Sequence, residues 1–89
     1  MPADQLTPDA RARLVAAAAE RLRASPRDVA LLRVEPRTWP DSSLGCPEPG
    51  FQYAQVLTPG YLVVARSAGG VELTLHTDED ARTVVCPTR

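Results

Sequence analysis

Several residue types and patterns that mark large classes of protein are scarce or missing in this sequence. Aromatic residues make up only 4% of the chain, whereas proteins that hold single-stranded nucleic acids stack the bases on aromatic side chains. The net charge of −1 gives no long-range field that would attract nucleic acid or an anionic membrane. No apolar run approaches the roughly eighteen residues of a membrane-spanning helix. We therefore expect no nucleic-acid partner and no membrane-spanning segment.

Sequence signatures of common enzymes are also missing. There is no glycine-rich phosphate loop, since Gly69-Gly70 fits a hairpin turn. A serine triad would need the only histidine, His76, but no nucleophile-elbow motif is present. Its other members would be Ser42 or Ser43 and Asp78. We predict that the protein is not an enzyme, has no catalytic residues and uses no cofactor.

The acidic turn after the histidine is the alternative place for chemistry. His76 and the carboxylates of Asp78, Glu79 and Asp80 could together bind a divalent cation. One tight turn does not guarantee the ligand number and geometry that calcium or zinc requires. The two cysteines lack a CxxC or histidine spacing that would indicate zinc. We predict no metal site and a solvated acidic turn.

The composition is that of a small globular protein. With 89 residues there is room for one core, and 44% hydrophobic with 24% charged residues is unlike a disordered tail. We predict a single domain over residues 1–89 and a monomer. Residues 1–4 have neither the basic start nor the following apolar stretch of a signal peptide. We expect either a cytoplasmic protein or a trimmed part of a longer secreted one.

A helix is predicted over residues 8–24. Thr7 can cap a free amide, Pro8 suits the first helical position, and Asp9 lies near the positive end of the helix dipole. Apolar residues recur on one face at helical spacing, namely Leu14, Val15, Ala18, Ala19 and Leu22. Ser25-Pro26 ends the helix because the residue before a proline avoids the helical region.

After this helix the hydrophobic period changes to two, which predicts strands. Ala30, Leu32 and Val34 lie on one face of the first strand, and the residues between them form a more polar face that is exposed to solvent. Pro36 cannot donate to a ladder, so we expect an edge strand or a bulge at that position. Trp39 falls off the parity of this strand, which agrees with a bulge.

Later strands are separated by turns. Residues 40–50 hold three prolines and two glycines, which forbid helix and sheet. We predict strands over 51–58, 61–67, 71–76 and 83–86, with turns at Pro59-Gly60 and Gly69-Gly70. The strand 61–67 is apolar on both faces and should be central, and Val71, Leu73 and Leu75 should face the core. The fold class is α+β, with one N-terminal helix packed on an antiparallel sheet of about four strands, cystatin-like in general layout.

The two cysteines, Cys46 and Cys86, allow two interpretations. A disulfide would close a loop of about forty residues and contribute on the order of 4 kcal/mol by the chain-entropy argument. Alternatively, both cysteines are reduced and buried as small apolar groups. A disulfide would indicate a secreted or cell-envelope protein, whereas reduced cysteines would indicate a cytoplasmic one.

A specific motif runs through the second half of the chain. It reads Trp-Pro-Asp-Ser-Ser-Leu-Gly-Cys-Pro-Glu-Pro-Gly over residues 39–50, and continues with Tyr53-Ala54-Gln55, Pro59-Gly60-Tyr61 and His76-Thr77. This pattern resembles a family of small bacterial secreted or lipoprotein domains of unknown function. The resemblance implies secretion behind a leader peptide and a disulfide between Cys46 and Cys86, and it lends no catalytic residues. The sequence departs from the family pattern at Ser42, where glycine is common, and at Leu75, where an aromatic residue often precedes the histidine.

The loop over residues 39–53 is the best candidate for a binding surface. A restrained, exposed loop loses little entropy on binding another protein, and peptidase inhibition is the sharpest form of that hypothesis. The binding residues would be Trp39, Asp41, Leu44, Pro47, Glu48, Pro49, Tyr53 and His76. The alternatives are a structural loop, in which Trp39, Leu44 and Phe51 cover an open end of the core, and an enzyme or metal site centred on His76.

Overall fold

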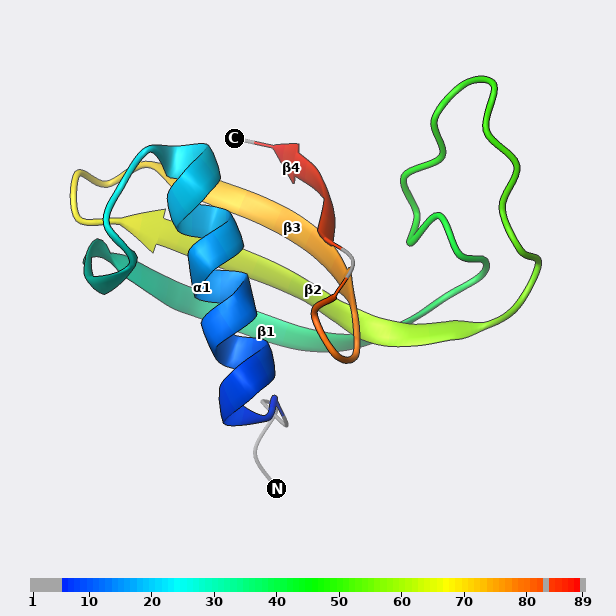
Figure 1. Ribbon diagram of the computed structural model, residues 1–89, viewed down its shortest axis with the longest axis horizontal. Coiled ribbons are helices and arrows are strands. Elements are labelled where there is room, and N and C mark those ends of the chain that lie inside the picture. The colour runs from blue at the N-terminus through cyan, green and yellow to red at the C-terminus, as the bar shows by residue number, and fades with distance from the viewer. Residues whose placement is uncertain (1–5, 83, 89) are drawn as a thin grey trace.

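A computed structural model describes residues 6–82 and 84–88 of the chain. Helix α1 (Pro8–Leu22) is followed by a short 3-10 turn, η1 (Pro26–Asp28), and by strands β1 (Val29–Trp39), β2 (Thr58–Ser67), β3 (Glu72–Asp78) and β4 (Val84–Thr88). The strands are antiparallel in the order β1-β2-β3-β4, and α1 crosses one face of the sheet (Figure 1). The predicted α+β layout, a helix on an antiparallel sheet, is confirmed. No helix among the described residues is long and apolar enough to cross a bilayer.

The start of α1 follows the predicted capping chemistry. The Thr7 hydroxyl accepts a hydrogen bond from the amide of Ala10, and Pro8 occupies the first turn. The helix ends at Leu22, two residues before the predicted end at residue 24. Arg23 there adopts a left-handed conformation (φ 55°), and its amide turns back toward the carbonyls of the last turn. The local sequence signals therefore predicted the first residue of the helix more accurately than the last.

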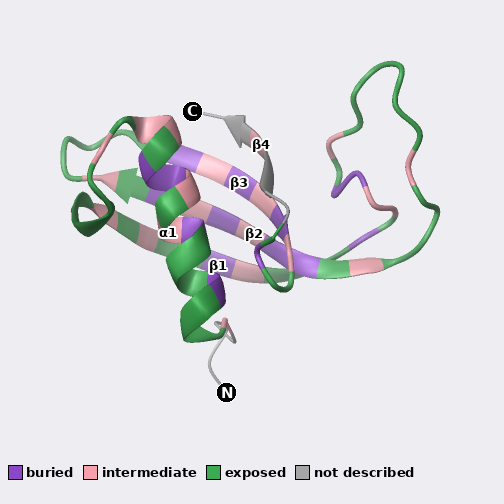
Figure 2. Cartoon of the chain, viewed as in Figure 1, coloured by how far each residue is buried: buried purple, intermediate pink, exposed green. Residues whose placement is uncertain are grey.

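The main core lies between α1 and the sheet. Its buried residues come from one face of the helix, from the strands and from the turn before β4, namely Ala10, Leu14, Ala18, Val34, Tyr61, Val63, Ala65, Leu73, Leu75 and Ala81. Figure 2 shows these buried segments alternating with exposed ones along the helix and strands. This alternation is the pattern expected when helix and sheet each bury one face.

β1 carries a bulge, but not at the predicted position. The register against β2 shifts between Leu31 and Arg33, so Leu32 is an extra residue and is 53% exposed. The prediction that Ala30 and Leu32 share the core face with Val34 is wrong. Because the bulge reverses the parity, the residues that join Val34 at the core from the start of β1 are Val29 and Leu31. Pro36 pairs in regular register on what is an edge strand, as predicted.

The predicted strand over residues 51–58 and the predicted turn at Pro59-Gly60 are both wrong. Residues 51–57 have no regular structure, and β2 already begins at Thr58. Pro59 and Gly60 pair with β1 inside the ladder. Alternating residues form a strand only where a neighbouring strand offers hydrogen bonds, and the segment 51–57 lies on a long excursion beyond the end of the sheet (Figure 1). At Gly60 a side chain is excluded because a Cβ would overlap the Thr77 carbonyl oxygen.

The hairpin from β2 to β3 agrees with the sequence in most respects. Gly70 has a positive φ of 90° in the turn, and β2 is an interior strand of the sheet, as predicted for residues 61–67. Leu73 and Leu75 face the core. Val71 does not, because it precedes β3 and is 43% exposed.

Candidate functional site: a loop held by a disulfide

Two rings stack on the face of the sheet opposite α1. Leu75 and Thr77 are buried, and Leu75 belongs to the core under α1, so His76 between them points to the other face of β3. Trp39, the last residue of β1, lies parallel to the His76 ring with centroids 4.4 Å apart and planes 15° apart. The indole N–H donates to the Thr77 carbonyl at 3.0 Å. The ends of β1 and β3 thus build a small aromatic platform.

The first turn of the loop packs onto this platform. Residues 40–57 connect β1 to β2 and are called the 40–57 loop below. Leu44 is 1% exposed and left-handed (φ 57°), and Gly45 follows with a φ of 80°. A Cβ on Gly45 would lie 3.2 Å from the Trp39 ring and 3.4 Å from His76 Nδ1. Glycine is therefore suited to this position both by its conformation and by the close approach of the rings.

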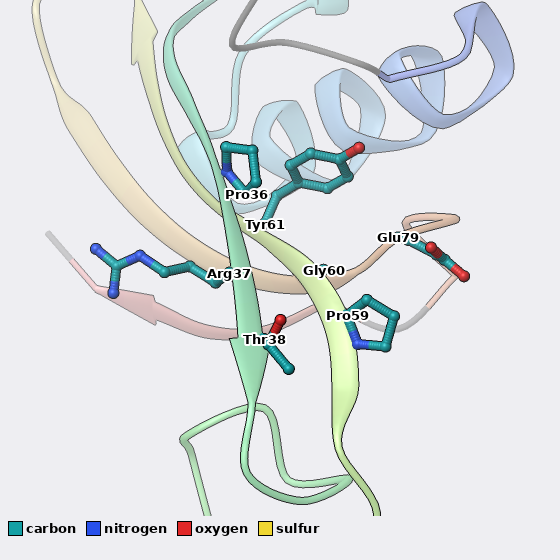
Figure 3. Close-up of a pocket in the computed structure, with 7 residues that line it drawn as sticks. All are labelled: Pro36, Arg37, Thr38, Pro59, Gly60, Tyr61 and Glu79. Carbon is teal, nitrogen blue, oxygen red and sulfur yellow. The ribbon is translucent and has the colours of Figure 1, made fainter.

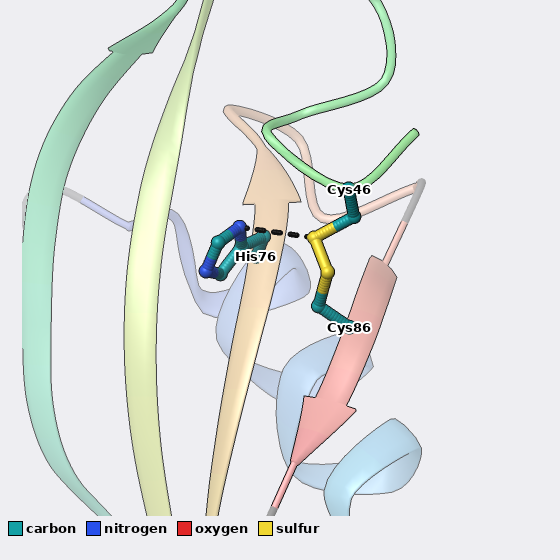
Figure 4. Close-up of side chains that lie close together, drawn as sticks. All are labelled: Cys46, His76 and Cys86. Atoms are coloured by element: carbon teal, nitrogen blue, oxygen red, sulfur yellow. Dashed lines mark hydrogen bonds between the residues drawn. A yellow bond between two sulfur atoms is a disulfide. The ribbon is translucent and has the colours of Figure 1, made fainter. Parts of the chain in front are cut away.

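A covalent bond closes the same site. Cys46 and Cys86 form a disulfide between the loop and β4, with Cα atoms 6.0 Å apart and a sequence separation of 40. His76 Nδ1 lies 2.8 Å from the Leu44 carbonyl oxygen. The same nitrogen lies 3.2 Å from Cys46 Sγ (Figure 4). A carbonyl can only accept, so Nδ1 carries the proton and faces both acceptors. The predicted pairing of the two cysteines is present, and the histidine is fixed beside it.

Hydrogen bonds also close the base of the loop. Asp41 accepts from the Ser43 hydroxyl and, at 2.9 Å, from the Ser43 amide. These bonds from the side chain and backbone of Ser43 lower the pKa of Asp41, because they favour the charged carboxylate. The Ser42 amide donates to the Ala54 carbonyl at 3.0 Å, and the Ala54 amide donates to the Ser42 hydroxyl at 2.8 Å. The two arms of the loop are thereby joined.

The outer part of the loop exposes apolar side chains. The Tyr53 hydroxyl accepts from the Glu48 amide at 3.0 Å, which ties the tip together. Yet Phe51 is 65% exposed, Val56 56% and Leu57 75%. Sequence reasoning placed these three on a strand and so missed them as a surface. Adjacent apolar residues at 56 and 57, which break the alternation of a half-buried strand, were the signal against that interpretation.

The predicted binding residues divide into two groups. Trp39, Leu44 and His76 gather around the disulfide, and Trp39 and Leu44 are buried there, so these two support the loop rather than face a partner. The exposed members at the tip are Pro47, Glu48 and Pro49, with Tyr53 half-buried beside them and Asp41 at the base. Phe51, which the structural alternative placed over the core, points to solvent instead.

The polar side chains considered as a serine triad all take part in hydrogen bonds that stabilise the loop or a turn. The Ser43 hydroxyl donates to Asp41, and His76 Nδ1 donates to the Leu44 carbonyl. The Ser42 hydroxyl accepts from the loop backbone. The Asp78 carboxylate accepts from the Arg82 amide at 3.0 Å and so stabilises the turn before β4.

A different set of residues has the proximity of metal ligands. Cys46, His76 and Cys86 offer ligand atoms that all lie within 4.8 Å of one another. In the disulfide the sulfurs are not thiolates, and the imidazole nitrogen facing Cys46 carries a proton. The trio could hold a thiophilic ion only after reduction of the disulfide and loss of that proton.

A separate hollow of about 290 Å³ lies beside the β1–β2 pair. It is lined by Pro36, Arg37, Thr38, Pro59, Gly60, Tyr61 and Glu79 (Figure 3). Figure 3 shows Arg37 and Glu79 pointing away from each other, so the charged groups do not converge on a common ligand position. None of the predicted binding residues lines this hollow.

Residues 11–86 match a family described as a domain of unknown function (DUF8738). The chain belongs to this family. The expected membership of an uncharacterised domain family is thus confirmed in its general form. The match to DUF8738 spans β1 to β3, the start of β4, the 40–57 loop and both cysteines, so the site described above lies inside the family's domain. Searches of curated proteins and of solved structures found no match, and the cystatin-like layout stays a prediction.

Proposed function

We propose that this DUF8738 domain is an extracytoplasmic, non-catalytic module that binds another protein through the exposed part of the 40–57 loop. One observation carries the proposal: the loop is held by a disulfide and by hydrogen bonds across its base, yet it presents Phe51, Val56 and Leu57 to solvent. Apolar side chains held out by a restrained segment are typical of interaction surfaces.

The restraint of the loop favours binding on entropic grounds. A flexible loop must lose conformational freedom when a partner orders it, whereas a preorganised loop has lost most of it on folding. Here the Cys46–Cys86 bond holds one arm, and the pair Ser42 and Ala54 joins it to the other. The exposed apolar residues can then contribute their burial to affinity with little ordering cost.

The charge of the surrounding segment indicates the chemistry of the partner. No arginine or lysine occurs between Arg37 and Arg66, and the acidic residues in that stretch are Asp41 and Glu48. The Asp41 carboxylate is charged at neutral pH, since its pKa is lowered further from an ordinary value of 3.8. We therefore propose a partner protein with an apolar pocket bordered by basic side chains.

The disulfide supports the proposed compartment. Disulfides persist in oxidising environments and are rare in the cytoplasm. Intact mass after alkylation, with and without prior reduction, checks this directly on protein taken from its own cells. Two alkylated cysteines in the unreduced sample would contradict an extracytoplasmic location.

Site-specific crosslinking tests the binding role. A photoreactive amino acid is placed at Phe51 or at Leu57, and a matched control carries it at Leu32, an exposed apolar residue at the far end of β1. We expect both loop positions to yield an adduct of the same mass in cells, and position 32 to yield none. The partner identified from the adduct is then purified, and Phe51→Ser should weaken its binding while Leu32→Ser should not. Adducts that are equal at all three positions, or absent from the loop, would refute the proposal.

Peptidase inhibition is a narrower form of the same proposal. It is favoured by the position of the exposed segment Pro47–Gly50 directly after a disulfide-bonded residue, since a covalently held loop resists the distortion that cleavage needs. Incubation with a panel of peptidases, followed by residual activity and intact mass, distinguishes an inhibitor from a substrate. Cleavage within the loop without inhibition would exclude this form.

A further inference from the structure

The Cys46–Cys86 disulfide has a hydrogen-bond donor within reach of one of its two sulfurs. His76 Nδ1 carries the proton, as its contact with the Leu44 carbonyl requires, and it lies 3.2 Å from Cys46 Sγ. Among the side chains that the structure describes, no such donor reaches Cys86 Sγ. The two sulfurs are therefore chemically unequal, although both cysteines are half-buried and within reach of solvent.

We propose that this disulfide is a site of thiol–disulfide exchange with a dithiol, in which Cys46 is the sulfur that leaves as a thiolate. The assignment goes beyond the proposed binding role and does not depend on what the loop binds. It requires a dithiol reductant, either a small molecule or a protein with a pair of reactive cysteines, which supplies two electrons.

The proposed exchange has two balanced steps. A thiolate of the dithiol attacks Cys86 Sγ, the Cys46–Cys86 bond breaks, and the electron pair remains on Cys46 Sγ as a thiolate. The second thiolate of the reductant then attacks the reductant sulfur that is bonded to Cys86 in the mixed disulfide. Cys86 leaves as a thiolate and the reductant becomes a disulfide. Protons lost by the dithiol are taken up by the two cysteines or by water.

The surroundings of His76 hold its N–H between the Leu44 carbonyl and Cys46 Sγ, beside the atom on which the negative charge develops. The ring stacks on Trp39, and the Leu44 carbonyl fixes which nitrogen bears the hydrogen. A donor that is already oriented stabilises a forming anion without reorganisation, and hydrogen bonds to charged acceptors are stronger than those to neutral ones. The geometry therefore lowers the barrier for cleavage that leaves the charge on Cys46 relative to cleavage that leaves it on Cys86.

The same geometry favours exchange over a metal site in the reduced protein. The nitrogen nearest the sulfurs is the protonated one, so a cation bound there would have to displace that proton and break the bond to Leu44. A thiolate on Cys46 needs neither change.

Reduction kinetics of a matched pair of variants test the role of the donor. His76→Phe keeps a ring to stack on Trp39 but removes the N–H, whereas His76→Asn keeps an N–H close to the Nδ1 position without the ring. With dithiothreitol as the reductant and acid quenching, we expect His76→Phe to be reduced about tenfold more slowly than the wild type, the effect of one hydrogen bond to a forming charge. His76→Asn should retain most of the rate. Equal rates in all three proteins, or faster reduction of both variants, would overturn the proposal.

The site of attack is a second, independent test. The folded, oxidised protein is treated briefly with glutathione, quenched with acid, alkylated and digested. Glutathione is expected on Cys86 and the alkyl group on Cys46, whereas in concentrated urea both cysteines should carry glutathione to a similar extent. Glutathione mainly on Cys46 in the folded protein would overturn the assignment. Stoichiometric zinc binding by the reduced protein that is lost in both His76 variants would also overturn it, in favour of a metal site.

Discussion

The face of the sheet under α1 and the face that carries the 40–57 loop are held by different interactions. Under α1 the contacts are almost entirely apolar, with Leu14, Val63 and Leu75 fully buried. On the opposite face a stacked pair of rings, a disulfide and hydrogen bonds to backbone carbonyls hold the loop. The stabilisation from burial scales with the apolar area removed from water, whereas the conformation of the loop depends on a few specific groups. Changes that abolish the geometry of the loop should therefore leave the helix-covered core folded, although less stable, whereas loss of that core should also abolish the geometry of the loop.

Removal of the disulfide is expected to have the largest effect. In Cys46→Ser with Cys86→Ser the constraint on a chain segment of sequence separation 40 is lost, which should lower the free energy of unfolding by about 4 kcal/mol. Urea unfolding measures this loss. Native-state hydrogen exchange of this variant should show that the Ser42 and Ala54 amides exchange through a local opening of lower free energy than the opening that exposes the amides of α1. Equal opening free energies in both regions would break the comparison, because they would mean that loop and core open together.

A core truncation should affect both faces. Leu75→Ala removes a fully buried side chain under α1 and should lower the free energy of unfolding by about 3 kcal/mol. The matched control is Leu32→Ala, at the exposed bulge of β1, which should change it by less than about 0.5 kcal/mol. Urea unfolding of both variants with the disulfide intact is the measurement. Similar values for the two would contradict the assignment of the core to the helix-covered face.

The smallest expected effect concerns acid pH. The pKa of Asp41 is lowered in the folded protein from its ordinary value of 3.8, first by the hydrogen bond from the Ser43 hydroxyl and then by that from the Ser43 amide. A folded pKa below the unfolded one stabilises the protein above the unfolded value, and this stabilisation disappears as the pH falls through the folded value. Asp41→Asn should therefore be less stable than the wild type at neutral pH, and the difference should begin to shrink near the ordinary value of 3.8 and be lost only once the pH is below the folded pKa. If the difference in stability between the two proteins persisted unchanged in acid, the charge on Asp41 would not contribute to the stability of the loop.

The parts of the fold that the sequence predicted correctly depend on local chemistry. Thr7 and Pro8 mark the helix start, and Gly70 marks the β2–β3 turn, because each acts through its own backbone or its near neighbours. The face of Leu32 was mispredicted because a bulge is set by the register of the partner strand. The segment 51–57 was mispredicted because strand formation needs a neighbour that the sequence does not reveal.

In the candidate site, the disulfide could be predicted from the sequence, whereas the ring stack and the hydrogen bond of His76 could not. With only two cysteines, Cys46 had one possible partner within the chain. The stack of Trp39 on His76 joins residues from different strands, and the hydrogen bond that fixes the tautomer of His76 runs to a backbone carbonyl in the loop. Neither contact leaves a pattern in the order of residues.

β1 ends the sheet on one side, with the extra residue Leu32 near its start and Pro36 near its middle. A bulge distorts the spacing of the free donors and acceptors along an edge, and a proline has no donor to offer. A second molecule approaching this border would find its ladder interrupted twice within a few residues. The domain can therefore keep a long outermost strand in solvent while discouraging the edge-to-edge pairing from which aggregates grow.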